Sequence, residues 1–174
     1  FWTETADGVA TPGFTDPAGD PGSVWNAVTT APDGSWSATV ASGGSGLRTL
    51  HLRARDAAGN LSAAGQFDFG IDPSAPVLSL DGGTVTQRVN SDFTVSGAFS
   101  DISGLASLEV AVSSDNVTFA LADPAAASFD NVAGTWSWSR VLGGQADGPY
   151  YYRFTATDLA GNTTEITRTV DLDR

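Results

Sequence analysis

The chain has 174 residues and a net charge of −12, with 20 acidic side chains against eight basic ones, all of them Arg. This charge argues against nucleic acid and anionic membrane surfaces as partners, because both are themselves negative. The absence of Cys and Lys excludes disulfides, thiolate metal sites and lysine-based chemistry. No apolar run approaches the roughly 20 residues that a membrane-spanning helix needs, so we expect no membrane insertion.

Short alternating runs separated by Gly, Pro, Asn and Asp are typical of an all-β protein with many tight turns. The first run, Phe1–Thr5, predicts a strand that is already under way, and the sequence contains no Met. We therefore expect an interior segment of a longer protein or a processed product. The Pro/Gly/Asp-rich stretch 7–33 predicts a long loop that packs through Phe14 and Trp25.

Three more strands are predicted in the first part of the chain. Gly34–Val40 alternates between apolar and polar residues, with Trp36 on the core face. Leu47–Asp56 alternates in the same way and places the single histidine, His51, on the outer face. Residues 67–71 form the last of the three. The following stretch, 72–76, contains two prolines, which cannot donate to a β-ladder, so we place a domain boundary there.

The boundary divides the chain into residues 1–72 and 73–174. The second part carries seven predicted strands within the length of one small β domain. Seven short strands with a tryptophan in the core fit an immunoglobulin-like sandwich. The expected strands lie near 77–80, 93–99, 108–112, 119–121, 134–138, 150–156 and 166–172.

One five-residue motif occurs twice, each time directly after a strand. Asp56-Ala57-Ala58-Gly59-Asn60 is followed 102 positions later by Asp158-Leu159-Ala160-Gly161-Asn162. A strand that runs into the same turn twice, about one domain length apart, indicates two copies of one module. The sequence therefore predicts two tandem immunoglobulin-like β-sandwich modules.

The motifs that carry a family resemblance are the strand with its Asp-x-Ala-Gly-Asn turn, the preceding Gly-Ser/Thr-Trp strand and the following Pro-containing linker. In these features the chain resembles the bacterial immunoglobulin-like repeats of large surface proteins, such as adhesins and biofilm proteins. The resemblance is strongest over residues 34–76 and 134–173. It implies a stalk or spacer repeat, and it implies that calcium binding at the junctions between repeats is one property found in the family.

The first module is expected to lack its N-terminal strands. When the two motifs are aligned, Phe1 falls near Glu109, so the first two strands of the second module have no counterpart in the first. Three explanations stay open: upstream strands outside this sequence, strands donated by a neighbouring subunit, or strands formed by residues 7–33. Without covering strands, the core residues Trp2, Trp36 and Phe67 are expected to be exposed, and strand edges to be unpaired.

Calcium is the one cofactor for which we find candidate ligands. In a seven-strand sandwich, the loop with Asp101, the turn with Asp158 and Asn162, and the linker residue Asp72 are expected at one pole, at the junction between modules. Ca²⁺ takes six to eight oxygen ligands, which three carboxylates, an amide and backbone carbonyls can supply. The alternative is that Asp158 and Asn162 only close a turn, with Gly161 at positive φ.

The remaining patterns indicate structure rather than chemistry. His51 has no second His or Cys beside which it could hold zinc, and two small sandwiches offer no obvious cleft for paired carboxylates, so we expect no enzyme. Tyr150 follows a Gly-Pro corner and is the candidate for a tyrosine corner, whose hydroxyl bonds to the backbone upstream. The two asparagines of the repeated turns and Asn116 match the N-glycosylation pattern, which we interpret as coincidence.

We therefore predict a structural repeat segment of a secreted or cell-surface bacterial protein, acting as a stalk, spacer or fibre-forming module in adhesion. Its expected partners are neighbouring repeats or neighbouring subunits. Two alternatives remain: a filament subunit assembled by strand donation, and a carbohydrate- or receptor-binding adhesin module. Exposed aromatic side chains at Phe14, Trp25 and Tyr151 would favour the binding module.

Overall fold

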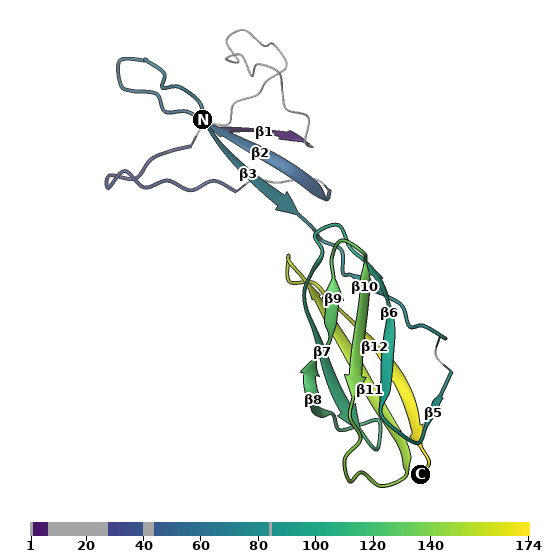
Figure 1. The fold of residues 1–174 in the computed structure, drawn as a ribbon. Coiled ribbons are helices and arrows are strands. Elements are labelled where there is room, and N and C mark those ends of the chain that lie inside the picture. The colour runs from purple at the N-terminus through teal and green to yellow at the C-terminus, as the bar shows by residue number, and fades with distance from the viewer. Residues whose placement is uncertain (1, 7–27, 40–43, 84) are drawn as a thin grey trace. The chain divides into compact units, whose positions relative to one another are not determined.

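The computed structural model describes residues 28–39, 44–83 and 85–174, together with the backbone of 2–6 (Figure 1). The chain divides into two compact units, Phe1–Asp72 (unit 1) and Pro73–Arg174 (unit 2). All regular structure in these ranges is β, and they contain no helix long and apolar enough to cross a membrane. The predicted all-β class is confirmed.

Unit 1 contains one antiparallel sheet of three strands in its described part, in the order β1-β2-β3. These strands are β1 (Trp2–Ala6), β2 (Gly46–Leu52) and β3 (Gly65–Ile71). The register pairs Leu52 with Trp2 on one side and with Gly65 on the other. Phe67 and Phe69 alternate onto the same face of β3, where their rings stack with centroids 6.2 Å apart.

The strand predicted for Gly34–Val40 does not form over its described residues, 34–39. Trp36 is 48% exposed instead of lying in a core. Hydrogen bonds to Asp33 hold only the turn before it, where the Ser35 amide donates to the carboxylate over 2.9 Å. A strand needs a partner on at least one edge, and the described part of unit 1 supplies none for this segment. Val40 lies outside the described residues, as do Phe14 and Trp25.

The outward position predicted for His51 is wrong. The side chain is only 2% exposed, although it alternates with the half-buried Leu50 and Leu52 along β2. Burial lowers the pKa of His51, and the charge of Asp68 raises it, with burial the stronger effect. The histidine therefore belongs to the packed interior of unit 1.

Unit 2 is a sandwich of two sheets, as Figure 1 shows. One sheet has the order β4-β6-β10-β9 and the other the order β5-β12-β11-β7-β8. All seven predicted strands are present, together with two short strands that the sequence analysis missed, β5 and β9. The strands are β4 (Val77–Leu78), β5 (Gln87–Val89), β6 (Phe93–Ser100), β7 (Leu105–Ser113), β8 (Ala120–Ala126), β9 (Ser128–Asp130), β10 (Thr135–Arg140), β11 (Gly148–Asp158) and β12 (Thr163–Leu172).

The core of unit 2 is built from the inward residues of both sheets. Trp136 packs on Phe154 with ring centroids 4.8 Å apart, and Trp138 packs on Tyr152 at 5.0 Å. All four side chains are at most 3% exposed. Offset and tilted ring pairs of this kind add stability beyond the area that they bury. Alternation along β10 and β11 thus produces the tryptophan core that the sequence predicts.

Gly97, in β6, lies where the chain that follows β4 approaches this strand closely. A Cβ atom at this position would lie 1.9 Å from the carbonyl oxygen of Ser79 and 2.9 Å from the indole nitrogen of Trp136. That nitrogen donates to the same Ser79 carbonyl over 3.2 Å. Only glycine leaves room here for the chain that follows β4 to cross β6 and bind the core tryptophan.

The chain enters and leaves unit 2 at opposite poles. The Asn162 side-chain amide donates to the carbonyl of Ser74 over 3.1 Å, which places the first residues of the unit beside the β11–β12 turn. At the other pole, Leu172 pairs with Gly148 and with Val89, and the C-terminus follows (Figure 1). The long axis of the sandwich therefore separates the two ends of the unit.

Candidate functional site

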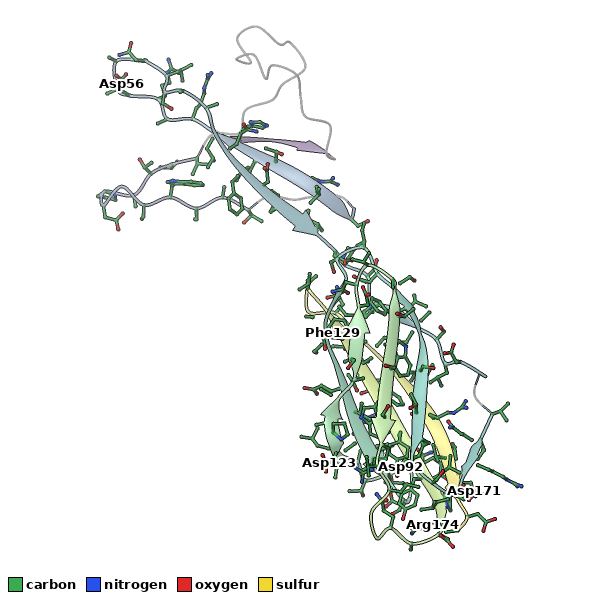
Figure 2. All side chains as sticks on the ribbon, in the orientation of Figure 1. Asp56, Asp92, Asp123, Phe129, Asp171 and Arg174 are labelled. Carbon is green, nitrogen blue, oxygen red and sulfur yellow. The ribbon has the colours of Figure 1, made fainter. Side chains whose placement is uncertain are left out.

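The repeated motif forms the same turn in both units. The Asp56 amide donates to the Asn60 carbonyl over 3.0 Å, and the Asn60 amide and side chain donate to the Asp56 carboxylate, each over 2.8 Å. Asp158 and Asn162 make the same three bonds at 3.0, 2.8 and 2.9 Å. Gly59 and Gly161 both adopt positive φ, 97° and 93°. Figure 2 shows Asp56 at the tip of the loop between β2 and β3.

The environment distinguishes the two copies. Asp56 is exposed, whereas Asp158 is only 1% exposed. Burial raises the pKa of Asp158, but hydrogen bonds from the side chain and amide of Asn162 and from the Ala160 amide outweigh it, so the pKa lies below its ordinary value. The carboxylate is therefore a buried negative charge that accepts hydrogen bonds from neutral donors of its own turn.

Three of the predicted calcium ligands lie together. One carboxylate oxygen from each of Asp72, Asp101 and Asp158 lies within 4.8 Å of the other two. Asp72 precedes the first residue of unit 2, Asp101 follows β6, and Asp158 ends β11. Loop packing supports the arrangement, because the Leu159 amide donates to the Gly104 carbonyl over 3.1 Å.

These three side chains offer carboxylate oxygens and negative charge, which are what a hard divalent cation binds. Oδ1 of Asp101 closes its own loop, accepting from the Ser103 amide and hydroxyl and from the Gly104 amide at 2.8 to 2.9 Å. The second oxygen of Asp101 accepts none of these bonds. Carboxylate oxygens close together are the ligands that Ca²⁺ prefers, and a cation would offset their mutual repulsion.

Asn162 differs from the other three candidates. Its amide nitrogen donates to the Asp158 carboxylate and to the Ser74 carbonyl, so that atom braces the turn. A ligand role is left to its amide oxygen only. Sequence reasoning missed Asn131, whose side chain accepts from the Leu105 amide over 2.8 Å and donates to the Leu105 carbonyl over 3.0 Å. No motif marks this residue, because its partner is 26 positions away.

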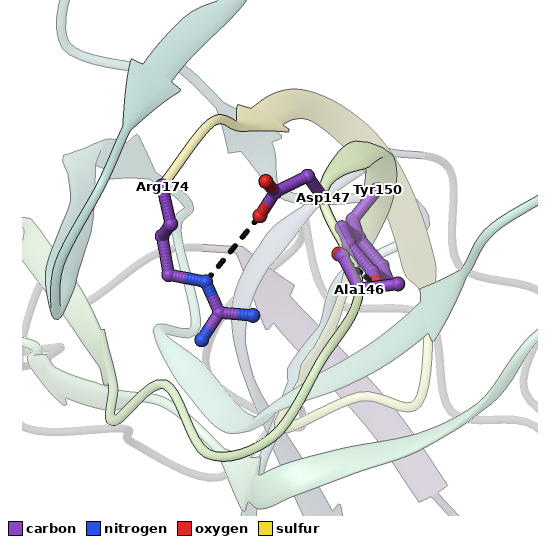
Figure 3. Close-up of polar contacts among 4 residues, drawn as sticks. All are labelled: Ala146, Asp147, Tyr150 and Arg174. Carbon is purple, nitrogen blue, oxygen red and sulfur yellow. Dashed lines mark hydrogen bonds and ion pairs between the residues drawn. The ribbon is translucent and has the colours of Figure 1, made fainter.

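At the opposite pole, the predicted tyrosine corner is confirmed. The Tyr150 hydroxyl donates to the carbonyl of Ala146 over 2.9 Å. Arg174 lies 3.4 Å from the carboxylate of Asp147 in the same region, and Figure 3 shows both contacts. These interactions fix the β10–β11 connection beside the end of β12. Tyr151, the one described aromatic candidate for ligand binding, is half-buried.

Solved structures with a similar fold come from proteins of several kinds. A tetra-tandem repeat from the extending region of a large adhesion protein is 21% identical, covers 99% of this chain and 41% of its own, and has a TM-score of 0.50. Fibronectin(III)-like modules of Clostridium thermocellum CbhA are 14% identical over 99% of this chain and 77% of theirs, with a TM-score of 0.44. An endo-β-1,4-mannanase from Thermotoga petrophila is 14% identical over 59% of this chain and 21% of its own, with a TM-score of 0.41.

Identities this low indicate similarity of fold alone. The chain spans about a fifth of the length of the mannanase and about two fifths of the adhesion-protein structure. A search of curated proteins gave no match. The sequence model of the bacterial Ig-like domain family, however, matches residues 74–174, which is more than half of the chain. The chain therefore belongs to the bacterial Ig-like domain family.

Proposed function

We propose that the chain is a spacer segment of a secreted or cell-surface bacterial protein, which holds other parts of that protein at a distance and acts through neighbouring repeats. The observation that supports it most is that the chain enters and leaves unit 2 at opposite poles. Each such unit then adds its long dimension to the reach of the protein. The ten residues of β12 alone span about 33 Å at about 3.3 Å per residue. The proposal assigns the chain no enzymatic activity.

The spacer function is tested by the length of tandem arrays. Arrays of two and four copies of residues 73–174, joined by the native residues 71–72, are compared by small-angle X-ray scattering. The expected result is a maximum dimension that grows linearly, by at least about 33 Å per added copy. Growth that follows the cube root of mass, as in a compact cluster, would show that the repeats do not act as spacers.

A second proposal concerns the metal: we infer that Asp72, Asp101 and Asp158 hold a calcium ion where the chain enters unit 2. The grouping of three carboxylate oxygens within 4.8 Å supports this proposal. Removing the repulsion between the carboxylates stabilises only the folded state, because the unfolded chain does not bring them together. Binding therefore raises the melting temperature, and the rise grows with the logarithm of the calcium concentration once that exceeds the dissociation constant.

Melting of the full chain in excess calcium and in excess chelator tests the metal proposal. Calcium is expected to raise the melting temperature, and Asp101→Asn is expected to abolish the rise while its amide oxygen keeps the bonds to Ser103 and Gly104. Asp115→Asn is the matched control, because Asp115 closes a similar loop after β7. Equal melting temperatures with calcium and chelator, or equal responses of the two variants, would contradict calcium binding at this group.

A further inference from the structure

One face of unit 1 corresponds to the core face of unit 2 but is not covered by any of the described residues. The repeated turns align β2 with β11 at an offset of 102 residues, so Leu50 and Leu52 take the places of Tyr152 and Phe154. The cross-strand register agrees, because Leu52 pairs with Trp2 as Phe154 pairs with Val110. Tyr152 and Phe154 are at most 2% exposed, whereas Leu50 and Leu52 are only half-buried.

The tryptophans and the neighbouring phenylalanine show the same contrast. Trp136 is 3% exposed in unit 2, while Trp36, its counterpart after the Gly-Ser/Thr pair, is 48% exposed. Phe67 on β3 is 61% exposed. Trp36 and Leu52 line a hollow of about 470 Å³, together with Val28 and Ala63. We call the surface formed by Trp36, Leu50, Leu52, Phe67 and Phe69 the acceptor face.

In unit 2, one continuous segment covers the equivalent surface. Within residues 77–100, β6 pairs with β10 and sets Gly97 opposite Trp136, and β4 packs beside β6. The same segment also closes the sheet edge, because β5 pairs in parallel with Val170–Leu172 of β12. In unit 1, the corresponding edge of β3 pairs with no strand other than β2 among the described residues.

We propose that the acceptor face of unit 1 binds an extended segment of the same character as residues 77–100, which pairs beside the Trp36 segment and along the edge of β3 that no described strand occupies. The chemistry of that partner follows from unit 2. It carries apolar residues at alternate positions and a glycine opposite Trp36, since any Cβ there would meet the indole. Its pairing strand carries no charge, as in Phe93–Ser100, which suits a unit that is itself net negative.

The partner is supplied in two ways to the full 174-residue chain. A synthetic peptide of residues 76–101 is added in solution, and residues 73–108 are fused ahead of Phe1, since Phe1 aligns with Glu109. Hydrogen exchange of β2 and β3 is the readout, because covered and paired amides exchange more slowly. Both forms of the partner are expected to slow exchange over residues 47–52 and 65–71 at least tenfold, with no change in β11 and β12.

Gly97→Val in the added segment is the matched control, because it leaves every other residue of the segment unchanged but blocks the approach to Trp36. It is expected to abolish the slowing. The proposal is overturned if the fused segment leaves exchange in unit 1 unchanged or if Gly97→Val protects equally well. It is also overturned if the unmodified chain already protects β2 and β3, either as a monomer covered by its own residues or as a dimer covered by a second copy.

Discussion

At the residue scale, aspartate side chains close the turns of both units by accepting backbone N–H groups. Asp33, Asp56, Asp101, Asp130 and Asp158 each accept at least one such bond within four residues. The short carboxylate reaches the amides two or three residues ahead, which glutamate reaches less well. This preference agrees with the composition, in which 17 of the 20 acidic residues are Asp. Among the described residues, these five and Asp115 serve turn geometry in this way.

Asp115 provides the clearest test of this use of aspartate. Its carboxylate accepts from the Ser113 hydroxyl at 2.7 Å and from the amides of Val117 and Thr118 at 2.8 Å, which lowers its pKa to about 2. A depressed pKa stabilises the fold above the ordinary value, and this contribution is lost as pH falls through about 2. Ser113→Ala is expected to raise the pKa of Asp115, as measured by carboxyl carbon NMR.

The control for Asp115 is Ser139→Ala, which removes a hydroxyl that bonds Thr94 instead. It is expected to leave the pKa of Asp115 at about 2. An unchanged pKa in Ser113→Ala would show that the Val117 and Thr118 amides alone hold the carboxylate in its ionised form.

Tyr150 gives a second prediction at this scale. Tyr150→Phe removes the hydrogen bond to the Ala146 carbonyl and is expected to lower the free energy of unfolding of unit 2 by about 1 kcal/mol. Chemical denaturation measures the change. Tyr151→Phe, one residue along, is the control and is expected to change it by less than about 0.5 kcal/mol. Equal effects of the two substitutions would contradict a structural role for the corner.

At the element scale, alternation and turn residues predict strands well wherever the strand can pair with a neighbour. The seven strands predicted for unit 2 all form, because each pairs with at least one other strand. β5 was missed because its three residues, Gln87–Val89, carry no apolar alternation and are fixed only by pairing with β12. The segment after Gly34 has the right pattern but no partner among the described residues, so pattern alone predicted a strand that does not form over residues 34–39.

The same limit applies to the candidate site. Topology reasoning from a seven-strand sandwich grouped Asp72, Asp101 and Asp158, and their carboxylates do lie together. The bonds that Asn131 makes to Leu105, and the use of the Asn162 amide nitrogen, depend on how loops pack against each other. Loop packing leaves no periodic trace in a sequence. Spacing therefore predicts which turns meet, but not which atom of each side chain faces inward.

Gly97 carries the prediction that belongs to β6. Gly97→Ala places a Cβ 1.9 Å from the Ser79 carbonyl oxygen, so the chain after β4 must shift or the Trp136 hydrogen bond must break. We expect a loss of about 3 kcal/mol in the free energy of unfolding, at the upper end of overpacking effects. Gly143→Ala, at a site where a Cβ meets nothing within 4 Å, is the control in the same denaturation experiment. Equal stability of the two variants would contradict the close crossing.

At the scale of the whole molecule, the described residues of the two units differ in how much core they form. Among them, the buried hydrophobic cluster draws on residues of unit 2, from Leu80 to Val170. A domain with its own core folds without its neighbour. We expect residues 73–174 alone to unfold in one cooperative transition, at the same denaturant midpoint as the more stable transition of the full chain. A lower midpoint that corresponds to a loss of more than about 0.5 kcal/mol in the free energy of unfolding would contradict this independence.

The parallel pairing of β5 with β12 has a mechanical consequence. A pulling force on the two ends of unit 2 acts at opposite poles, along the direction of β12. β5 is connected toward the first pole through β4, while β12 ends at the second, so tension slides these two strands past one another. The bonds between them, including the one from the Asp173 amide to the Val89 carbonyl, then share the load at the same moment. A unit loaded in this way resists stretching until the whole contact fails at once.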